Sequence, residues 1–222
     1  MSIINVIGPV MVGPSSSHTA GAVKIGKFAY NYIGGIPQTV RFILHGSFAT
    51  TYMGHGTDKA LLSGIIGFNV DDIRIKDIFE IIKKYDLRYE FLFEDLGDVH
   101  PNTVRIIAEK DSVEYKIQAC SVGAGEILVN EIDGNSVKLN GHTPALSILN
   151  KDITGALSEI LKIISAHGIN VANVTLNRVS KIFEEASCII ELDEAPSYML
   201  VQELQKSSYV ISCRYIPCLL YT

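Results

Sequence analysis

A polar stretch followed by a helical pattern near the N-terminus constrains the fold most. Gly13-Pro14 is a turn signal, and residues 15–19 then read Ser-Ser-Ser-His-Thr. Apolar residues recur at helical spacing over residues 22–33. Gly34-Gly35 follows, where a helix end favours a left-handed residue. The pattern predicts a helix that begins at the serines and ends at residue 33.

The start of this helix has the chemistry of an anion site. The first turn of a helix has unpaired N–H groups and carries the positive end of the macrodipole. Four hydroxyls beside those groups are candidates to hold a small carboxylate: Ser15, Ser16, Ser17 and Thr19. His18 lies next to them, and an imidazole suits proton transfer near neutral pH. In the alternative, which a serine-rich helix start more often represents, one serine caps the helix and His18 is solvated.

Two further polar segments contain histidines. Residues 45–58 follow a predicted strand and include three glycines and two histidines, so we expect a ligand-binding loop that contains His55. His100 and Asn102 flank a proline, which holds His100 extended. A mobile surface loop and a simple turn are the alternatives. Because all three segments belong to the same predicted domain, the sequence favours a shared pocket.

The apolar patterns predict an α+β fold with a boundary near residue 143. Before it, a helix that Thr57 or Asp58 would cap is expected to end at residue 66, and a further helix is expected over about 72–82. Strands are expected at 39–45, 88–93, 103–109, 113–119 and 126–132. After it, the order is strand 145–149, helix 156–164, strands 170–178 and 183–192, helix 197–205 and strand 210–217. This β-α-β-β-α-β order is that of ferredoxin-like domains.

Composition excludes several classes of protein. The 222 residues carry a formal net charge of −5, and no Lys/Arg cluster could follow a nucleic acid backbone. No apolar run is long enough to span a bilayer and the N-terminus has no basic leader, so a cytoplasmic protein is expected. The four cysteines, at 120, 188, 213 and 218, have no cluster or zinc spacing, so we expect no metal ligands here.

The C-terminal part resembles the ACT domain, a small amino-acid-sensing module. The residues that carry the resemblance are Asp-Ile-Thr-Gly-Ala-Leu at 152–157 and His-Gly-Ile-Asn-Val-Ala-Asn-Val at 167–174. The family's loop reads Asp-x-Pro-Gly, and Thr154 replaces the proline here. The resemblance implies an ACT domain at residues 144–222 that pairs with a second copy. It would bind a regulatory ligand through Asp152, Gly155 and Asn170.

The N-terminal part, residues 1–143, resembles the β chain of iron–sulfur-dependent L-serine dehydratase. The motifs are residues 13–19, His-Gly-Ser at 45–47 with Gly-His-Gly-Thr-Asp at 54–58, and His-Pro-Asn-Thr at 100–103. The domain is also similar to the allosteric substrate-binding fold of some phosphoglycerate dehydrogenases. The resemblance implies a lyase of amino-acid degradation and gluconeogenesis that converts L-serine to pyruvate and ammonia without pyridoxal phosphate. Cysteines of a partner α chain would bind its [4Fe–4S] cluster.

The elimination of water from serine requires a base for the Cα proton and a Lewis acid for the departing hydroxide. We expect the serines and Thr19 to bind the carboxylate, with His18 as the first candidate for the base and His55 as the second. His100 and Asn102 would shape the pocket. The alternative is a purely regulatory serine-sensing subunit with no catalytic residues of its own. Three histidines favour catalysis, and no Gly-x-Ser-x-Gly elbow supports a serine hydrolase.

Overall fold

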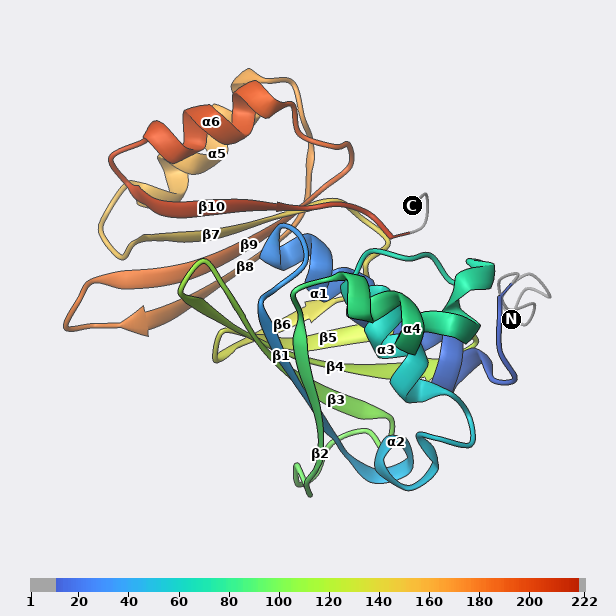
Figure 1. The fold of residues 1–222 in the computed structure, drawn as a ribbon. Helices are drawn as coiled ribbons and strands as arrows, with labels where there is room; N and C mark the ends of the chain where they lie inside the picture. Colours follow the sequence, from blue (N-terminus) through green and yellow to red (C-terminus); the bar gives the residue numbers. More distant parts are fainter. Residues whose placement is uncertain (1–10, 220–222) are drawn as a thin grey trace. The chain divides into compact units, whose positions relative to one another are not determined.

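The computed structural model describes residues 11–219. The chain divides into two compact units, shown as a ribbon in Figure 1. The first contains the described residues up to Gly134 together with Lys138–Asn140, and the second contains Asn135–Val137 together with the residues from Gly141 onward. Helices and two β-sheets are both present, so the chain is of the mixed α+β class.

The sheet of the first unit has six strands in the order β2-β1-β3-β4-β5-β6. Their bounds are β1 (Thr39–Leu44), β2 (Arg88–Phe93), β3 (Thr103–Lys110), β4 (Val113–Gly123), β5 (Glu126–Ile132) and β6 (Asn135–Leu139). β1 pairs with β2 in parallel and with β3 in the antiparallel direction. The polar segments after β1 and before β3 therefore meet at one end of the sheet.

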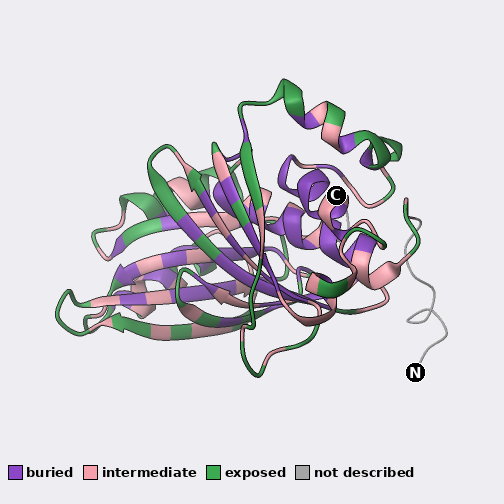
Figure 2. Cartoon of the chain, turned by 60° about the horizontal axis from the view of Figure 1, so that its bottom comes forward, coloured by how far each residue is buried: buried purple, intermediate pink, exposed green. Residues whose placement is uncertain are grey.

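The helices of the first unit begin with a π-helix, Ser16–Gly21, which continues into α1 (Ala22–Ile33). The others are α2 (Gly46–Thr51), α3 (Thr57–Ile65) and α4 (Ile78–Ile81), the last flanked by 3₁₀ turns at Ile73–Asp77 and Ile82–Lys84. Gly26 of α1 and Gly64 of α3 let the two helices cross with their backbones in contact. A Cβ on Gly64 would lie 2.2 Å from the Val23 carbonyl oxygen. Buried residues follow the strands and the inner faces of these helices (Figure 2).

The second unit has the element order β-α-β-β-α-β. It comprises β7 (Ala145–Lys151), α5 (Ala156–Ala166), β8 (Val171–Ser180), β9 (Glu185–Leu192), α6 (Tyr198–Lys206) and β10 (Val210–Ile216). The strands form an antiparallel sheet in the order β10-β7-β9-β8. Side chains of both helices and of the sheet form one core, including Leu146, Ile160 and Leu204.

Several local expectations were wrong. Residues 45–58 are not all loop, because α2 occupies Gly46–Thr51. The cap of α3 is Gly56 in a left-handed conformation (φ 68°), whereas Thr57, which was a candidate cap, is buried inside the helix. The helix expected over 72–82 is broken into two 3₁₀ turns and the four-residue α4. Strand β6 was missed, and β4 continues to Gly123.

Candidate active site

The serine-rich segment forms an unusual helix start. Ser15 has an extended backbone and its Oγ accepts a hydrogen bond from the His18 backbone N–H at 3.1 Å, so Ser15 is the cap. The Ser15 carbonyl accepts from both Thr19 N–H (2.9 Å) and Ala20 N–H (3.4 Å), which widens the first turn. Wide π turns are frequent at functional sites. Here the turn fixes the position of His18.

His18 contacts the second polar segment. Its Nε2 lies 2.9 Å from Ser47 Oγ, and its Nδ1 lies 3.5 Å from Ser15 Oγ. The ring centroid lies 4.8 Å from that of His55, in an edge arrangement, and 5.4 Å from that of the fully buried Phe48. The structure therefore brings His18 and His55, the two predicted catalytic residues, together with Ser47.

This environment disfavours the protonated form of His18. Burial lowers the pKa of His18, and the neighbouring His55 lowers it further. Because both ring nitrogens of His18 face hydroxyls, the ring is held in one orientation. His55 Nδ1 is buried and has no hydrogen-bond partner among the described residues. The pair therefore places an imidazole of lowered pKa beside a buried ring nitrogen that has no partner among the described residues.

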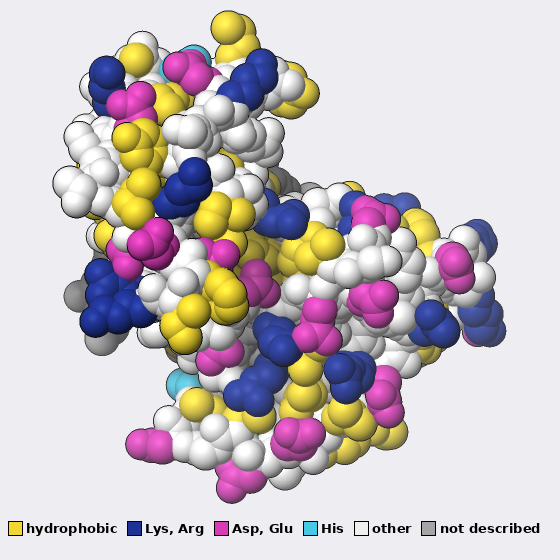
Figure 3. Space-filling model, turned by 90° about the vertical axis from the view of Figure 1, so that its left-hand side faces the viewer, with side chains coloured by type: hydrophobic (Ala, Val, Ile, Leu, Met, Phe, Trp, Pro, Cys, Tyr) yellow, Lys and Arg dark blue, Asp and Glu magenta, His cyan; other side chains and the backbone are white. Residues whose placement is uncertain are grey.

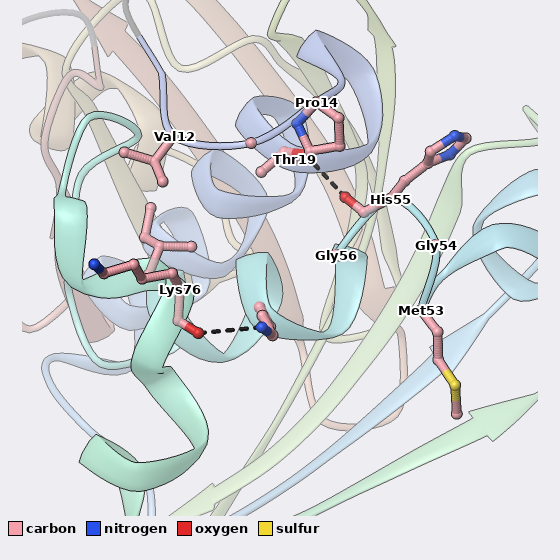
Figure 4. A pocket seen from close by; sticks show the side chains of 11 residues that line it. Val12, Pro14, Thr19, Met53, Gly54, His55, Gly56 and Lys76 are labelled. Atoms are coloured by element: carbon pink, nitrogen blue, oxygen red, sulfur yellow. Dashed lines mark hydrogen bonds between the residues drawn. The ribbon is translucent and has the colours of Figure 1, made fainter.

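A pocket of about 270 Å³ lies against the backbone of the second segment (Figure 4). Its lining residues come from four segments: Val12, Gly13, Pro14, Thr19, Met53, Gly54, His55, Gly56, Lys59, Ile75 and Lys76. Thr19 is 3% exposed, and its hydroxyl donates to the His55 carbonyl at 3.0 Å. This hydrogen bond links the lining residues 12–19 to the lining residues 53–59. The His55 ring points away from Val12 and Lys76 in Figure 4. Two lysines give this pocket a positive charge.

The polar segment at residues 100–103 supports the start of α2. The Ser47 N–H donates to the Pro101 carbonyl at 2.8 Å. Gly46 is required there, because its φ is +53° and a Cβ would lie 2.7 Å from the same oxygen. His100 Nδ1 accepts from Asn102 N–H within the loop, and Asn102 Nδ2 donates to the Ser121 carbonyl of β4. The segment therefore positions Ser47. The side chains of His100 and Asn102, which were predicted to bind substrate, instead form hydrogen bonds to the chain itself.

Ser47 is the contact residue that the sequence analysis did not single out. It was visible only as part of the His-Gly-Ser motif at 45–47. His45 in that motif has a different position: its Nδ1 accepts from the Leu96 N–H at 3.1 Å and lies 3.6 Å from Asp95 Oδ1. A nitrogen that accepts from an N–H carries no proton, so His45 does not form an ion pair with Asp95 through this nitrogen. It anchors the segment after β2.

The cysteines do not fit an iron–sulfur cluster. Cys120, Cys188 and Cys213 are buried, and burial raises the pKa of Cys188 to about 11 and that of Cys213 to about 12. A cluster ligand must be a thiolate. Within residues 11–219 no group of three or more His, Cys, Asp or Glu side chains is arranged to hold a metal ion.

Surface charge is mixed. On the face shown in Figure 3, acidic and basic side chains are interspersed among hydrophobic ones. Among the described helices, none is long and apolar enough to cross a membrane.

The predicted regulatory residues lie at two ends of one helix. Asp152 and Gly155 precede α5, where Gly155 is the left-handed cap (φ 91°) and Asp152 pairs with Arg178 of β8. Asn170 follows α5 and donates to Asp193 Oδ2 at 2.7 Å. The 11 residues of α5 span about 16 Å, so Asn170 does not converge with the other two within one chain.

The first unit thus has the features of an enzyme subunit with a histidine and hydroxyl site. The family model for "Serine dehydratase beta chain" matches residues 2–97. The chain is 36% identical over 210 residues to the "Probable L-serine dehydratase, beta chain" of Bacillus subtilis, covering 95% of each. It is 36% identical over 195 residues to the "L-serine dehydratase, beta chain" of Peptoniphilus asaccharolyticus, covering 87% of each. The chain belongs to the family of L-serine dehydratase β chains.

A longer relative matches more weakly. The "L-serine dehydratase TdcG" of Escherichia coli is 26% identical over 190 residues, which are 75% of this chain and 40% of that protein. The chain is thus similar to a minor part of a larger dehydratase.

Proposed function

We propose that this β subunit contributes the proton-transfer and carboxylate-binding side of an active site that deaminates L-serine together with a cluster-bearing α subunit. The observation that carries the proposal is His18, an imidazole of lowered pKa that lies between two serine hydroxyls and faces His55. A neutral imidazole with fixed orientation is suited to accept a proton from carbon. We assign His18 as the base and His55 as the second histidine of the site.

The reaction needs little more from this chain. Removal of the Cα proton and departure of the Cβ hydroxide give an aminoacrylate, whose imine form is hydrolysed to pyruvate and ammonia. The substrate carboxylate would lie at the helix start near the unpaired N–H groups. Ser15 already bonds the His18 N–H and Thr19 bonds the His55 carbonyl. Ser16 and Ser17 are therefore the hydroxyls that we assign to the carboxylate, with His100 and Asn102 at the rim.

The α subunit supplies what this chain lacks. Three of the four cysteines are buried, Cys218 is half-buried, and all four are dispersed in the sequence, so we place the [4Fe–4S] cluster on the partner. The similarity to only 40% of the longer E. coli relative supports this division, because the remaining sequence of that protein is available for the missing part. No pyridoxal phosphate is needed in this scheme.

We further propose that the second unit is a ferredoxin-like ACT domain that regulates the enzyme. Its β-α-β-β-α-β order and its strand order β10-β7-β9-β8 support this assignment. Because Gly155 and Asn170 lie at opposite ends of α5, a single ligand can contact both only when a second copy brings its own Asn170 close. Self-association is thus part of this proposal.

The His18→Asn substitution tests the catalytic assignment in the assembled enzyme. Loss of the base lowers kcat by a factor of about 10² or more, while binding of the α subunit is unchanged. The control is His167→Asn, since His167 pairs with Glu203 in the second unit and has no role in the proposed chemistry. Normal turnover of His18→Asn would favour the alternative, a serine-sensing subunit without catalytic residues.

A further inference from the structure

Strand β2 presents an unusual row of aromatic side chains at the edge of the first sheet. β2 is the terminal strand in the sheet order (Figure 1). Tyr89, Phe91 and Phe93 alternate along it and therefore point to the same face. Phe91 stacks on the fully buried Phe42 of β1, with ring centroids 5.1 Å apart. The middle residue of the row, Phe91, therefore packs against the core of the first unit.

The outer part of this row is exposed. Tyr89 is 39% and Phe93 50% exposed, although both are large apolar side chains. Tyr52, which follows α2, lies 4.9 Å from Phe93 and 6.4 Å from Phe91, measured between ring centroids. We call Tyr52, Tyr89, Phe91 and Phe93 the aromatic edge. An exposed aromatic cluster on a terminal strand is typical of a surface that another protein covers.

The aromatic edge is continuous with the candidate active site. Tyr52 is three residues from His55, and its carbonyl accepts from the Thr57 N–H at 2.8 Å in the same segment. Leu44, which directly precedes His45, pairs with Phe93 in the sheet. A protein seated on the aromatic edge would therefore border the segment that carries His55.

The segment that follows the aromatic edge is acidic, whereas the start of β2 is not, because Arg88 precedes Tyr89 and Arg41 of β1 pairs with Glu90. Residues 89–104 include four carboxylates and no Lys or Arg. Of these carboxylates, Glu94, Asp95 and Asp98 lie together on the exposed segment after β2. A complementary partner would place an apolar centre against the aromatic residues and basic side chains against this segment.

We infer that the aromatic edge is where the cluster-bearing α subunit docks. The inference rests on the proposed function, because a composite active site requires the partner to reach the segment around His55. Tyr89 and Phe93 of the aromatic edge are exposed, the edge borders that segment, and the acidic residues that follow it give a partner a charge to complement. A second copy of this chain is the competing occupant, and the test separates the two.

The experiment compares variants of the full chain in binding to anaerobically purified α subunit. Phe93→Asp, and independently Tyr89→Asp, weaken the α/β complex about tenfold or more, because buried aromatic residues dominate interface energies. At saturating α subunit, turnover is within about twofold of wild type. The matched control is Val113→Asp, since Val113 is 45% exposed but lies at the opposite end of β3 and β4.

Wild-type affinity for both edge variants would overturn the inference, as would an altered self-association of the isolated variants without a change in α binding. Circular dichroism and thermal unfolding confirm that each variant is folded. A wild-type complex that forms but makes no pyruvate would reject the proposed function alone. Absence of a wild-type complex would reject both.

Discussion

At the scale of single residues, the proposed role of His18 as the base predicts how turnover depends on pH. Burial and His55 both lower the pKa of His18 from its ordinary value of 6.5, so its protonation requires a lower pH. We predict that the acid limb of kcat/KM for the assembled enzyme falls below pH 6.5. The same shift disfavours protonation of the folded state, so the contribution of His18 to stability declines only as the pH falls below 6.5. Activity that already declines on acidification through pH 7.5 would contradict this assignment.

Ser47 acts through His18 and is a positioning residue. Its hydroxyl lies 2.9 Å from Nε2, so Ser47→Ala leaves the ring with one fewer fixed contact. We expect kcat to fall about tenfold with KM unchanged, because misplacement of a catalytic group affects the chemical step. Ser47→Thr retains the hydroxyl and restores most of the rate.

The control for Ser47 lies on the same helix. Thr50 bonds only the Gly46 and Ser47 carbonyls and is exposed, so Thr50→Ala keeps wild-type kinetics. Equal effects of Ser47→Ala and Thr50→Ala would show that α2 matters only for stability.

At the scale of elements, the contact of α1 with α3 depends on glycine. Alanine normally favours a helix over glycine by about 1 kcal/mol. At Gly64 a Cβ meets backbone atoms of α1 at 2.2 and 2.7 Å, which cannot move independently of the helix. We predict that Gly64→Ala destabilises the chain by about 1–3 kcal/mol. Thermal unfolding measures this as a lower Tm.

The Gly54→Ala substitution is the matched control for Gly64. Its nearest neighbour would be the Thr51 carbonyl oxygen at 3.7 Å, an ordinary contact. The Tm of Gly54→Ala should equal that of wild type. A Gly64→Ala variant that is as stable as wild type would mean that the two helices do not cross this closely.

Long elements were predictable from the sequence and short or irregular ones were not. The bounds of β2 and β5 match the predicted residues and α1 ends at the predicted residue 33, because an apolar period extends over each element. The six-residue α2 contains less than two helical turns and therefore gives no period. The π turn at Ser16–Gly21 is defined by backbone hydrogen bonds, which no residue pattern specifies.

The candidate site was predictable to a similar degree. His18 and His55 were identified by their chemistry, since an imidazole in a glycine- and serine-rich segment is a candidate catalytic group. Their contact, at 4.8 Å between ring centroids, depends on how the two segments pack. The Ser47 contact with His18 likewise follows from the orientation of α2, which the loop at Pro101 fixes through backbone bonds. Sequence spacing contains no information on such contacts.

At the scale of the whole molecule, the proposed function gives this chain one part of an active site that it shares with a partner subunit. In that proposal the first unit supplies the base and the carboxylate site, and its one cysteine, the buried Cys120, is too few to hold a cluster. The second unit contains Cys188 and Cys213 in its core, where thiols with a pKa of about 11 and 12 are protonated and inert. A second protein is therefore needed for the proposed activity.

The most direct test of this requirement is anaerobic pyruvate formation from L-serine by three preparations: this chain alone, the α subunit alone, and the two mixed. Iron content and cluster absorbance are followed in each. We predict iron only where the α subunit is present and pyruvate only in the mixture, with the pyruvate lost when the mixture contains His18→Asn. Full activity of the α subunit alone would contradict a composite active site and would leave this chain a regulator.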